Sequence, residues 1–332
     1  PIIEVTGRTY PVTVFYQRIG GGENEQVVDD EGVERAVLMA VEGSLETERG
    51  GGASAVSHVG AQDILVFLPG EREIRNVANL LRKHVSDLLE VLPLYSRLSN
   101  AEQNRVFAPH SNRRIVLATN VAETSITVPN IGFVIDPGTA RISRYSYRTK
   151  VQRLPVEAIS QASANQRMGR CGRIAPGICV RLYDEASFEG RDAFTDPEIM
   201  RSNLASVILQ MKSLKLGEVN KFPFINPPEE KLINDGYRLL DELGAVDKNK
   251  ELTPLGRSLT RLPVDPRVGR MLIEANQLGC LSELISIGSG LSLPEPWLRP
   301  HDKRAAADEK HRAFKDKDSD FLSFVNLWDT HE

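Results

Sequence analysis

Residues 166–173, with the sequence QRMGRCGR, hold the side chains best suited to chemistry. Arg170 and Arg173 stand three positions apart, and each offers a planar, permanently charged fork that can point across a cleft at an anionic group. Gly169 and Gly172 let the backbone approach a partner closely. Taken alone, the segment fits a phosphate site and a solvated arginine-rich loop about equally.

Residues 114–138, RIVLATNVAETSITVPNIGFVIDPG, shift that balance toward phosphate binding. They place a polar loop between two expected strands. Its polar side chains are Thr119, Asn120, Thr124, Ser125 and Thr127. Hydroxyls and backbone amides at the carboxyl end of a strand suit phosphate oxygens. A plain turn also uses such residues, but it does not need an arginine-rich partner segment at this distance.

Positive charge gathers in one part of the chain. The formal net charge of −4 does not indicate nucleic-acid binding, yet an average can hide a local basic face. Residues 141–173 contain a single acid, Glu157. Their basic residues are Arg141, Arg144, Arg148, Lys150, Arg153, Arg167, Arg170 and Arg173. This region is therefore the candidate contact surface for a polyanion.

Within it, residues 138–155 (GTARISRYSYRTKVQRLP) alternate basic and aromatic side chains and contain no acid. Arg144 and Arg148 can hold phosphates, and Tyr145 or Tyr147 can stack on a base. The alternative is a hairpin that tyrosine packing across its strands stabilises. We expect the hairpin as a whole to lie near nucleic acid and leave each single residue open.

A metal site is not expected. Cys171, Cys179 and Cys280 are widely spaced and form no CxxC pair, and the six histidines are scattered without a second ligand three or four positions away. We expect buried free thiols.

The surrounding elements alternate short apolar runs with amphipathic segments. The runs cover residues 64–69, 90–95, 114–119 and 132–136. This order predicts a parallel α/β sheet with both faces covered. Ligands bind past the carboxyl ends of such strands, so the loops after Leu68, Tyr95 and Thr119 are the places to search. A β-rich segment at 9–17, a helix around 25–47 and an inert glycine-rich loop at 50–52 precede this core.

After Tyr183 the spacing of apolar residues becomes helical. Core stripes are expected at Leu204, Val207, Ile208, Met211 and Leu214, and again at Ile233, Tyr237 and Leu240. Residues 246–259 read as a short hairpin that leads into a helix, as in a winged-helix domain, and later segments predict a helical bundle. No apolar stretch approaches the roughly 20 residues that span a bilayer.

Several segments together resemble DEAH-box helicases, and most closely the bacterial HrpA-type RNA helicases. TNVAETSIT resembles the family's motif V, QRMGRCGR its motif VI, and ILVFLPGEREI its motif IV. RTYPV, LYSRLS, NLASVILQMKSL, LTPLGR and LPVDPR also fall in the family's order, so the resemblance covers essentially the whole chain. It implies a RecA-like parallel sheet domain at 1–183 with a β-hairpin about 139–157. A winged-helix domain at 184–262 and a partial, ratchet-like helical bundle at 263–332 follow.

The resemblance implies an ATP site shared between two RecA-like domains, of which this chain supplies the second wall. Gln166, Arg170 and Arg173 face the γ-phosphate, with the arginines as fingers that stabilise charge on the transferring group. Thr127 approaches the nucleotide, and Ser125 senses the γ-phosphate. Phe107 stacks on the adenine, with a core role as the competing interpretation.

For RNA, the resemblance implies contacts of Thr119 and Asn120 with the backbone, with Gly70 nearby, and a hairpin carrying Arg144 and Arg148 that splits or guides the strand. No G-x-x-x-x-G-K-[ST] loop and no DEAH box occurs in the sequence. ATP and Mg²⁺ would then be bound mainly by a first RecA-like domain, and this piece alone should not hydrolyse ATP.

The expected function is therefore the C-terminal part of a cytoplasmic, monomeric helicase that couples ATP hydrolysis to movement along single-stranded RNA. Two alternatives stay open: a non-catalytic RNA-binding scaffold with a residual motor domain, and a DNA-directed helicase. The parent sequence upstream of Pro1 would distinguish the scaffold from the enzyme. Unwinding of matched RNA and DNA duplexes would distinguish a DNA-directed helicase from an RNA helicase.

Overall fold

A computed structural model describes residues 10–19, 30–49, 62–85, 89–293, 296–297, 299 and 303–331. The chain divides into two compact units. Unit 1 comprises Pro1–Arg144 and Arg153–Asp196, and unit 2 comprises Tyr145–Gln152 and Pro197–Glu332. The glycine-rich loop expected at 50–52 lies outside the described residues.

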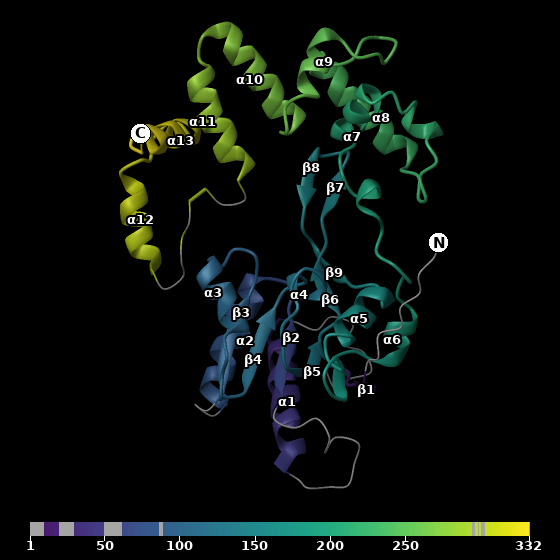
Figure 1. The fold of residues 1–332 in the computed structure, drawn as a ribbon, viewed down its shortest axis with the longest axis vertical. Coiled ribbons are helices and arrows are strands. Elements are labelled where there is room, and N and C mark those ends of the chain that lie inside the picture. Colours follow the sequence, from purple (N-terminus) through teal and green to yellow (C-terminus); the bar gives the residue numbers. More distant parts are fainter. Residues whose placement is uncertain are drawn as a thin grey trace. The chain divides into compact units, whose positions relative to one another are not determined.

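Unit 1 is built on a six-stranded sheet in the order β1-β10-β5-β2-β4-β3, and all neighbouring strands run parallel (Figure 1). The strands are β1 (Val12–Tyr16), β2 (Asp63–Phe67), β3 (Glu90–Leu94), β4 (Arg114–Ala118), β5 (Ile131–Asp136) and β10 (Gly177–Arg181). The parallel α/β sheet predicted from the apolar runs is confirmed. Strand β10 was not predicted, because its short GICVR run is separated from the arginine-rich segment by only three residues.

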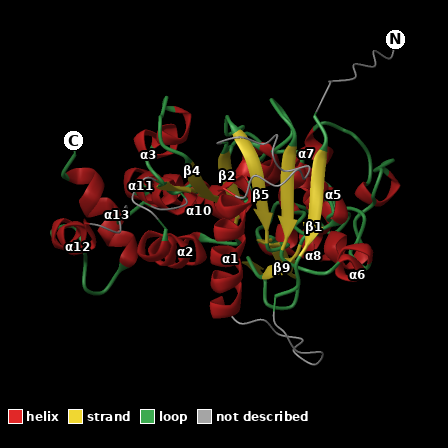
Figure 2. Ribbon diagram, turned by 90° about the horizontal axis from the view of Figure 1, so that it is seen from below, coloured by secondary structure: helices red, strands yellow, loops and turns green. Residues whose placement is uncertain are grey.

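Both faces of the sheet are covered, which is why its strands are apolar without interruption (Figure 2). The helices of unit 1 are α1 (Asp30–Arg49), α2 (Glu71–His84), α3 (Asn100–Asn104), α4 (Val121–Thr124), α5 (Gln161–Met168) and α6 (Glu185–Glu189), with a 3₁₀ turn η1 (Arg105–Phe107). Ile64 and Val66 pack with α1 and α2 on one face. Leu65 and Phe67 pack with η1 and α4 on the other. Successive side chains of β2 thus pack into two different apolar cores, one on each face of the sheet.

Between β5 and α5 the chain forms two strand pairs, where the hairpin was predicted. Strands β6 (Thr139–Arg141) and β9 (Val156–Ala158) pair in unit 1. Strands β7 (Arg144–Ser146) and β8 (Val151–Arg153) pair beyond them. The residues between Tyr145 and Gln152 belong to unit 2.

Unit 2 is otherwise helical, as predicted. Its helices are α7 (Ala205–Ser213), α8 (Glu230–Glu242), α9 (Pro254–Leu259), α10 (Pro266–Leu278), α11 (Leu281–Ser292), α12 (Arg304–Arg312) and α13 (Asp320–Asp329), with 3₁₀ turns η2 (Glu198–Met200) and η3 (Val219–Lys221). The predicted short hairpin is present as a bridge between Val246 and Leu252 ahead of α9. Leu214, expected in a core stripe, is exposed because it lies at the end of α7 beyond the buried turn.

Among the described residues, no helix has both the length and the apolar character that crossing a membrane requires.

Gly256 in α9 should tolerate no side chain. A Cβ atom there would lie 2.0 Å from the carbonyl oxygen of Ala245, which is backbone and cannot rotate away. We expect Gly256→Ala to lower the free energy of unfolding by about 3 kcal/mol. Urea denaturation followed by circular dichroism measures this loss. In the control Gly43→Ala, the added Cβ of α1 meets nothing within 4 Å, so stability should be unchanged or raised. Equal midpoints for the two variants would contradict the steric argument.

Candidate functional site

The carboxyl ends of three strands meet at one edge of the unit 1 sheet. The amide of Thr119, just past β4, donates to the carbonyl of Leu94 in β3 at 3.2 Å. The amide of Leu68, just past β2, donates to the carbonyl of Ala118 at 2.8 Å. The loops that the sequence indicated as candidate ligand sites therefore begin side by side.

The segment after Thr119 was expected to be a loop, but it contains the short helix α4. Asn120 precedes this helix and Ser125 ends it. The side chains of Asn120, Ser125 and Thr127 are exposed. The turn thus presents polar side chains to solvent next to the strand ends.

Helix α5 carries the start of the arginine-rich segment. Its first turn is capped by the hydroxyl of Ser160, which accepts from the amide of Ser163 at 3.2 Å. Gln166 is exposed on the helix. Past its end, Gly172 has φ +72, and a Cβ there would lie 2.5 Å from Val12 in β1. Only glycine fits this turn, because the left-handed backbone and the close strand both exclude a side chain.

The two segments are joined by the arginines that the sequence singled out. Nη1 of Arg170 donates to the carbonyl of Ile126 at 3.4 Å. Nη1 of Arg173 donates to the hydroxyl of Thr127 at 3.3 Å, and its Nε donates to the carbonyl of Gly169 at 3.2 Å. Thr127, predicted near a nucleotide, therefore orients one of the arginines.

Arg170 and Arg173 have no carboxylate within ion-pair distance in the described part of the chain. Nε of Arg170 is buried and has no hydrogen-bond partner. Burial lowers the pKa of Arg170, and the neighbouring charge of Arg173 lowers it further, with Glu123 opposing. Two like charges held together without a carboxylate in ion-pair contact form an environment that an anion would stabilise.

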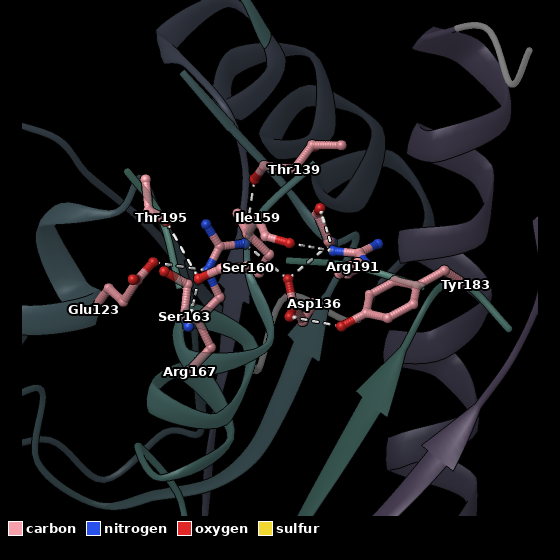
Figure 3. Close-up of polar contacts among 11 residues, drawn as sticks. Glu123, Asp136, Thr139, Ile159, Ser160, Ser163, Arg167, Tyr183, Arg191 and Thr195 are labelled. Atoms are coloured by element: carbon pink, nitrogen blue, oxygen red, sulfur yellow. Dashed lines mark hydrogen bonds and ion pairs between the residues drawn. The ribbon is translucent and has the colours of Figure 1, made fainter. Parts of the chain in front are cut away.

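Arg167 of the same segment has a different environment that sequence reasoning did not assign. Its side chain is 1% exposed and forms ion pairs with Glu123 and Asp136 (Figure 3). Burial alone would lower the pKa of Arg167, but the charges of Asp136 and Glu123 outweigh it and raise the pKa. The presence of Glu123 in the loop segment and Asp136 at a strand end was the available signal.

Phe107 and Gly70 occupy contrasting positions near the strand ends. The ring of Phe107 is 46% exposed at the end of η1, so the competing core role is wrong for this side chain. Gly70 is buried ahead of α2, where a Cβ would lie 2.7 Å from both Arg141 and Glu73. This position can therefore present only backbone groups to a ligand.

The hairpin residues are more engaged than their sequence indicates. Arg144 forms ion pairs with Glu157 at 2.9 Å and Asp196 at 2.6 Å, and these hydrogen bonds raise the pKa of Arg144. Arg148 is exposed, with its guanidinium 5.9 Å from the ring centre of Tyr147. Of the two arginines, only Arg148 is without a carboxylate partner in the part of the chain that the structure describes.

The tyrosines of the hairpin are held by residues outside the hairpin, and not by the cross-strand packing that the structural alternative expected. Tyr145 and Tyr147 pack against the apolar core of unit 2. The hydroxyl of Tyr145 donates to Asp235 at 2.8 Å, and Lys150 forms an ion pair with the same carboxylate. Tyr145 is therefore held by protein contacts rather than presented for stacking.

The cysteines show no reactive environment. Cys171 and Cys179 are buried, Cys280 is half-buried, and all three are free thiols. Burial raises the pKa of Cys171 to about 12. Within the described residues, no group of three or more histidine, cysteine or acidic side chains could hold a metal ion.

Three helicase domain families match the chain. Residues 54–175 match the helicase conserved C-terminal domain. Residues 237–264 match the winged-helix part, and residues 265–324 the ratchet-like part, of the helicase-associated domain HA2.

Among curated proteins, the chain is 59% identical to the ATP-dependent RNA helicase HrpA of Escherichia coli K12 and 54% identical to the HrpA homologue of Haemophilus influenzae. It is 36% identical to the human probable ATP-dependent RNA helicase DHX35. Each alignment covers 99% of the chain, but only 24%, 24% and 45% of the relatives. The chain thus spans about a quarter of the length of the two bacterial relatives.

Among solved structures, the E. coli DEAH/RHA helicase HrpB is similar, with a TM-score of 0.75 and 27% identity. The match covers 97% of the chain and 38% of that protein. A second structure, described as the E. coli DExH-box NTPase HrpB, gives a TM-score of 0.73 at 27% identity.

The exposure of Phe107 can be tested against its buried neighbour Val106. Phe107→Ala should change the free energy of unfolding by less than about 1 kcal/mol, because its ring makes little core contact. Val106 is 2% exposed, and Val106→Ala should cost about 2 kcal/mol. Urea unfolding of both variants beside the unmodified chain gives the comparison. A larger loss for Phe107→Ala than for Val106→Ala would restore the core interpretation.

Proposed function

The chain belongs to the HrpA-type DEAH-box RNA helicase family, and on that premise we propose that it is the C-terminal motor part of an ATP-dependent RNA helicase. Its sheet domain forms the second wall of an ATP site and grips single-stranded RNA, so that hydrolysis drives movement along the strand. The observation that carries this proposal is the pair Arg170 and Arg173, held beside the Thr127 turn without a carboxylate counter-charge.

On the nucleotide side, each predicted residue has a position that supports its role. Arg170 and Arg173 are two permanent cations with incomplete hydrogen bonding, which suits an incoming γ-phosphate whose charge spreads over several oxygens. Exposed Gln166 and Ser125 lie in the same two segments. Phe107 has an exposed face on which an adenine can stack. These residues supply cations and a ring, and they fit a nucleoside triphosphate.

On the RNA side, Thr119 and Asn120 lie at the strand ends with Gly70 close by, where backbone and hydroxyl groups can meet phosphates. Arg148 adds an exposed charge at the hairpin tip. Arg144 is better supported as a residue that holds the hairpin base, because both of its partners are carboxylates of unit 1. Its earlier assignment to RNA stays a prediction.

The remaining parts of the site would come from a first RecA-like domain of the same full-length protein. Mg²⁺ held there would neutralise charge on the β- and γ-phosphate oxygens. The winged-helix and bundle boundaries near Leu262, the monomeric state and the cytoplasmic location remain predictions from sequence.

The first test uses the 332-residue chain itself. We expect no ATP hydrolysis above buffer with or without RNA, because the sequence holds no phosphate-binding P-loop. A phosphate-release assay with a polyuridine strand measures this. Weak RNA binding should survive and fall steeply with salt, because phosphate contacts release counterions. Steady turnover after removal of contaminating ATPases would contradict the shared-site proposal.

The second test concerns Arg170→Ala and Arg173→Ala in the full-length protein. Each should cripple hydrolysis, at a cost of roughly 4 to 7 kcal/mol of transition-state stabilisation, and leave single-stranded RNA binding largely intact. Lysine should rescue poorly, because its point charge cannot bridge two oxygens as an arginine fork does. Single-turnover hydrolysis and fluorescence anisotropy with a short RNA, at one salt concentration, separate the two functions.

Near-normal hydrolysis by both alanine variants would make the finger assignment wrong. An equal loss of RNA binding would instead place the two arginines in a phosphate-gripping patch.

A further inference from the structure

Arg167 of α5 is buried, and its side chain contacts four other elements; Figure 3 shows its contacts with Glu123, Asp136 and Thr139. From α5, its Nε donates to Glu123 of α4 at 3.0 Å. Its Nη1 donates to Asp136 at the end of β5 at 2.7 Å and to the carbonyl of Thr139 in β6 at 3.2 Å. The guanidinium lies 4.7 Å from the ring centre of Phe67 in β2. One side chain therefore links the two segments that carry the candidate site.

The carboxylate of Asp136 is held as firmly as the arginine. Its side chain is 0% exposed and also accepts from the amide of Gly138 at 2.8 Å and the hydroxyl of Tyr183 at 3.4 Å. The guanidinium of Arg191 lies over the ring of Tyr183, with its central carbon 3.9 Å from the ring centre (Figure 3). Arg191 also donates to the carbonyl of Gly138 at 2.8 Å. Because every partner of Asp136 is itself fixed, the carboxylate cannot follow Arg167 if α5 shifts.

Such a buried pair is a poor device for stability alone. Taking charges out of water costs free energy, and a well-packed apolar set of similar volume is often as stable. What the guanidinium adds is direction, since its planar fork donates hydrogen bonds to two carboxylates only at fixed angles. The cluster therefore restricts where α5 can lie against α4.

That restriction matters because the candidate fingers are weakly held. Arg170 follows Arg167 by three positions and touches the α4 turn through one bond of 3.4 Å to Ile126. Arg173 reaches the same turn through one bond of 3.3 Å to Thr127. The two cations repel each other, so their own contacts do not hold the two segments together as strongly as the pair of Arg167 with Glu123 does.

We propose that Arg167, locked by Glu123 and Asp136, is the positioning residue that holds α5 against α4 so that Arg170 and Arg173 meet the transferring phosphoryl group. This inference rests on the proposed function. Arg167 itself is too deeply buried to touch the nucleotide and acts only through the fingers. The same cation fixes the carbonyl of Thr139, where the chain enters the hairpin, so finger position and hairpin base share one anchor.

The experiment compares two nucleotide states in the full-length protein. ADP reports ground-state binding, and ADP with tetrafluoroaluminate reports binding of a planar, transition-state-like group that needs the fingers. Glu123→Gln removes one charge at nearly constant shape, and Arg167→Lys keeps the charge but loses the fork. Each should weaken the fluoroaluminate complex by at least about tenfold, because a small misplacement of a catalytic group is costly. The affinity for ADP should stay within about threefold of that of the unmodified protein, because contacts that are equally strong in the ground state and the transition state do not change.

The quantity compared is the affinity for ADP with tetrafluoroaluminate divided by the affinity for ADP. This ratio separates positioning from a loss of folded protein, because unfolding lowers the binding stoichiometry and leaves each dissociation constant unchanged. Glu90→Gln is the matched control. Glu90 also binds a buried arginine, Arg114, at 2.7 Å, but at the amino-terminal ends of β3 and β4. This variant should lose stability and keep the wild-type ratio.

The outcomes are distinct. An unchanged ratio in both Glu123→Gln and Arg167→Lys overturns the positioning role, as does a fall of the ratio in Glu90→Gln. Arg170→Ala runs beside them as a test of the fingers. If it keeps fluoroaluminate affinity, or if the unmodified protein binds no ADP, the proposed function fails. If it loses that affinity while both Glu123→Gln and Arg167→Lys keep it, only the positioning role fails.

Discussion

A parallel sheet that is covered on both faces has a single place to meet a ligand, and the rest of unit 1 follows from this constraint. Buried side chains fill both sides of β2, β4 and β5, so the strands cannot present polar groups along their length. All carboxyl ends point the same way. Polar chemistry is therefore confined to the turns at one edge, where α4 and the segment after α5 lie close together.

The second constraint is charge. Four of the basic residues between 141 and 173 are already paired with carboxylates: Arg141 with Glu73, Arg144 with Glu157 and Asp196, Lys150 with Asp235, and Arg167 with Glu123 and Asp136. The other four, Arg148, Arg153, Arg170 and Arg173, have no such partner in the portion of the chain described. The basic region is thus half structural scaffold and half available charge.

The paired arginines and those without a carboxylate partner therefore have different roles. A buried, fully paired guanidinium fixes geometry, because moving it would strand a charge away from its partners. A guanidinium with incomplete bonding can gain an anion at little reorganisation cost, which is what a site that stabilises developing charge requires. Within eight residues, 166–173, the chain holds one arginine of the first kind and two of the second.

The sequence alone determined the alternation of strands and helices, because the spacing of apolar residues and the length of apolar runs indicate which faces are buried. It also indicated the family, because short motifs keep their residue types and order. It could not separate Arg167 from Arg170, three positions apart in one motif. That difference arises only when β5 brings Asp136, and α4 brings Glu123, to one of them. Likewise, exposure of Phe107 and the docking of Tyr145 on Asp235 depend on partners far along the chain. Only the tertiary structure determines which charges and rings are buried and paired, because partners distant in sequence set desolvation and pairing.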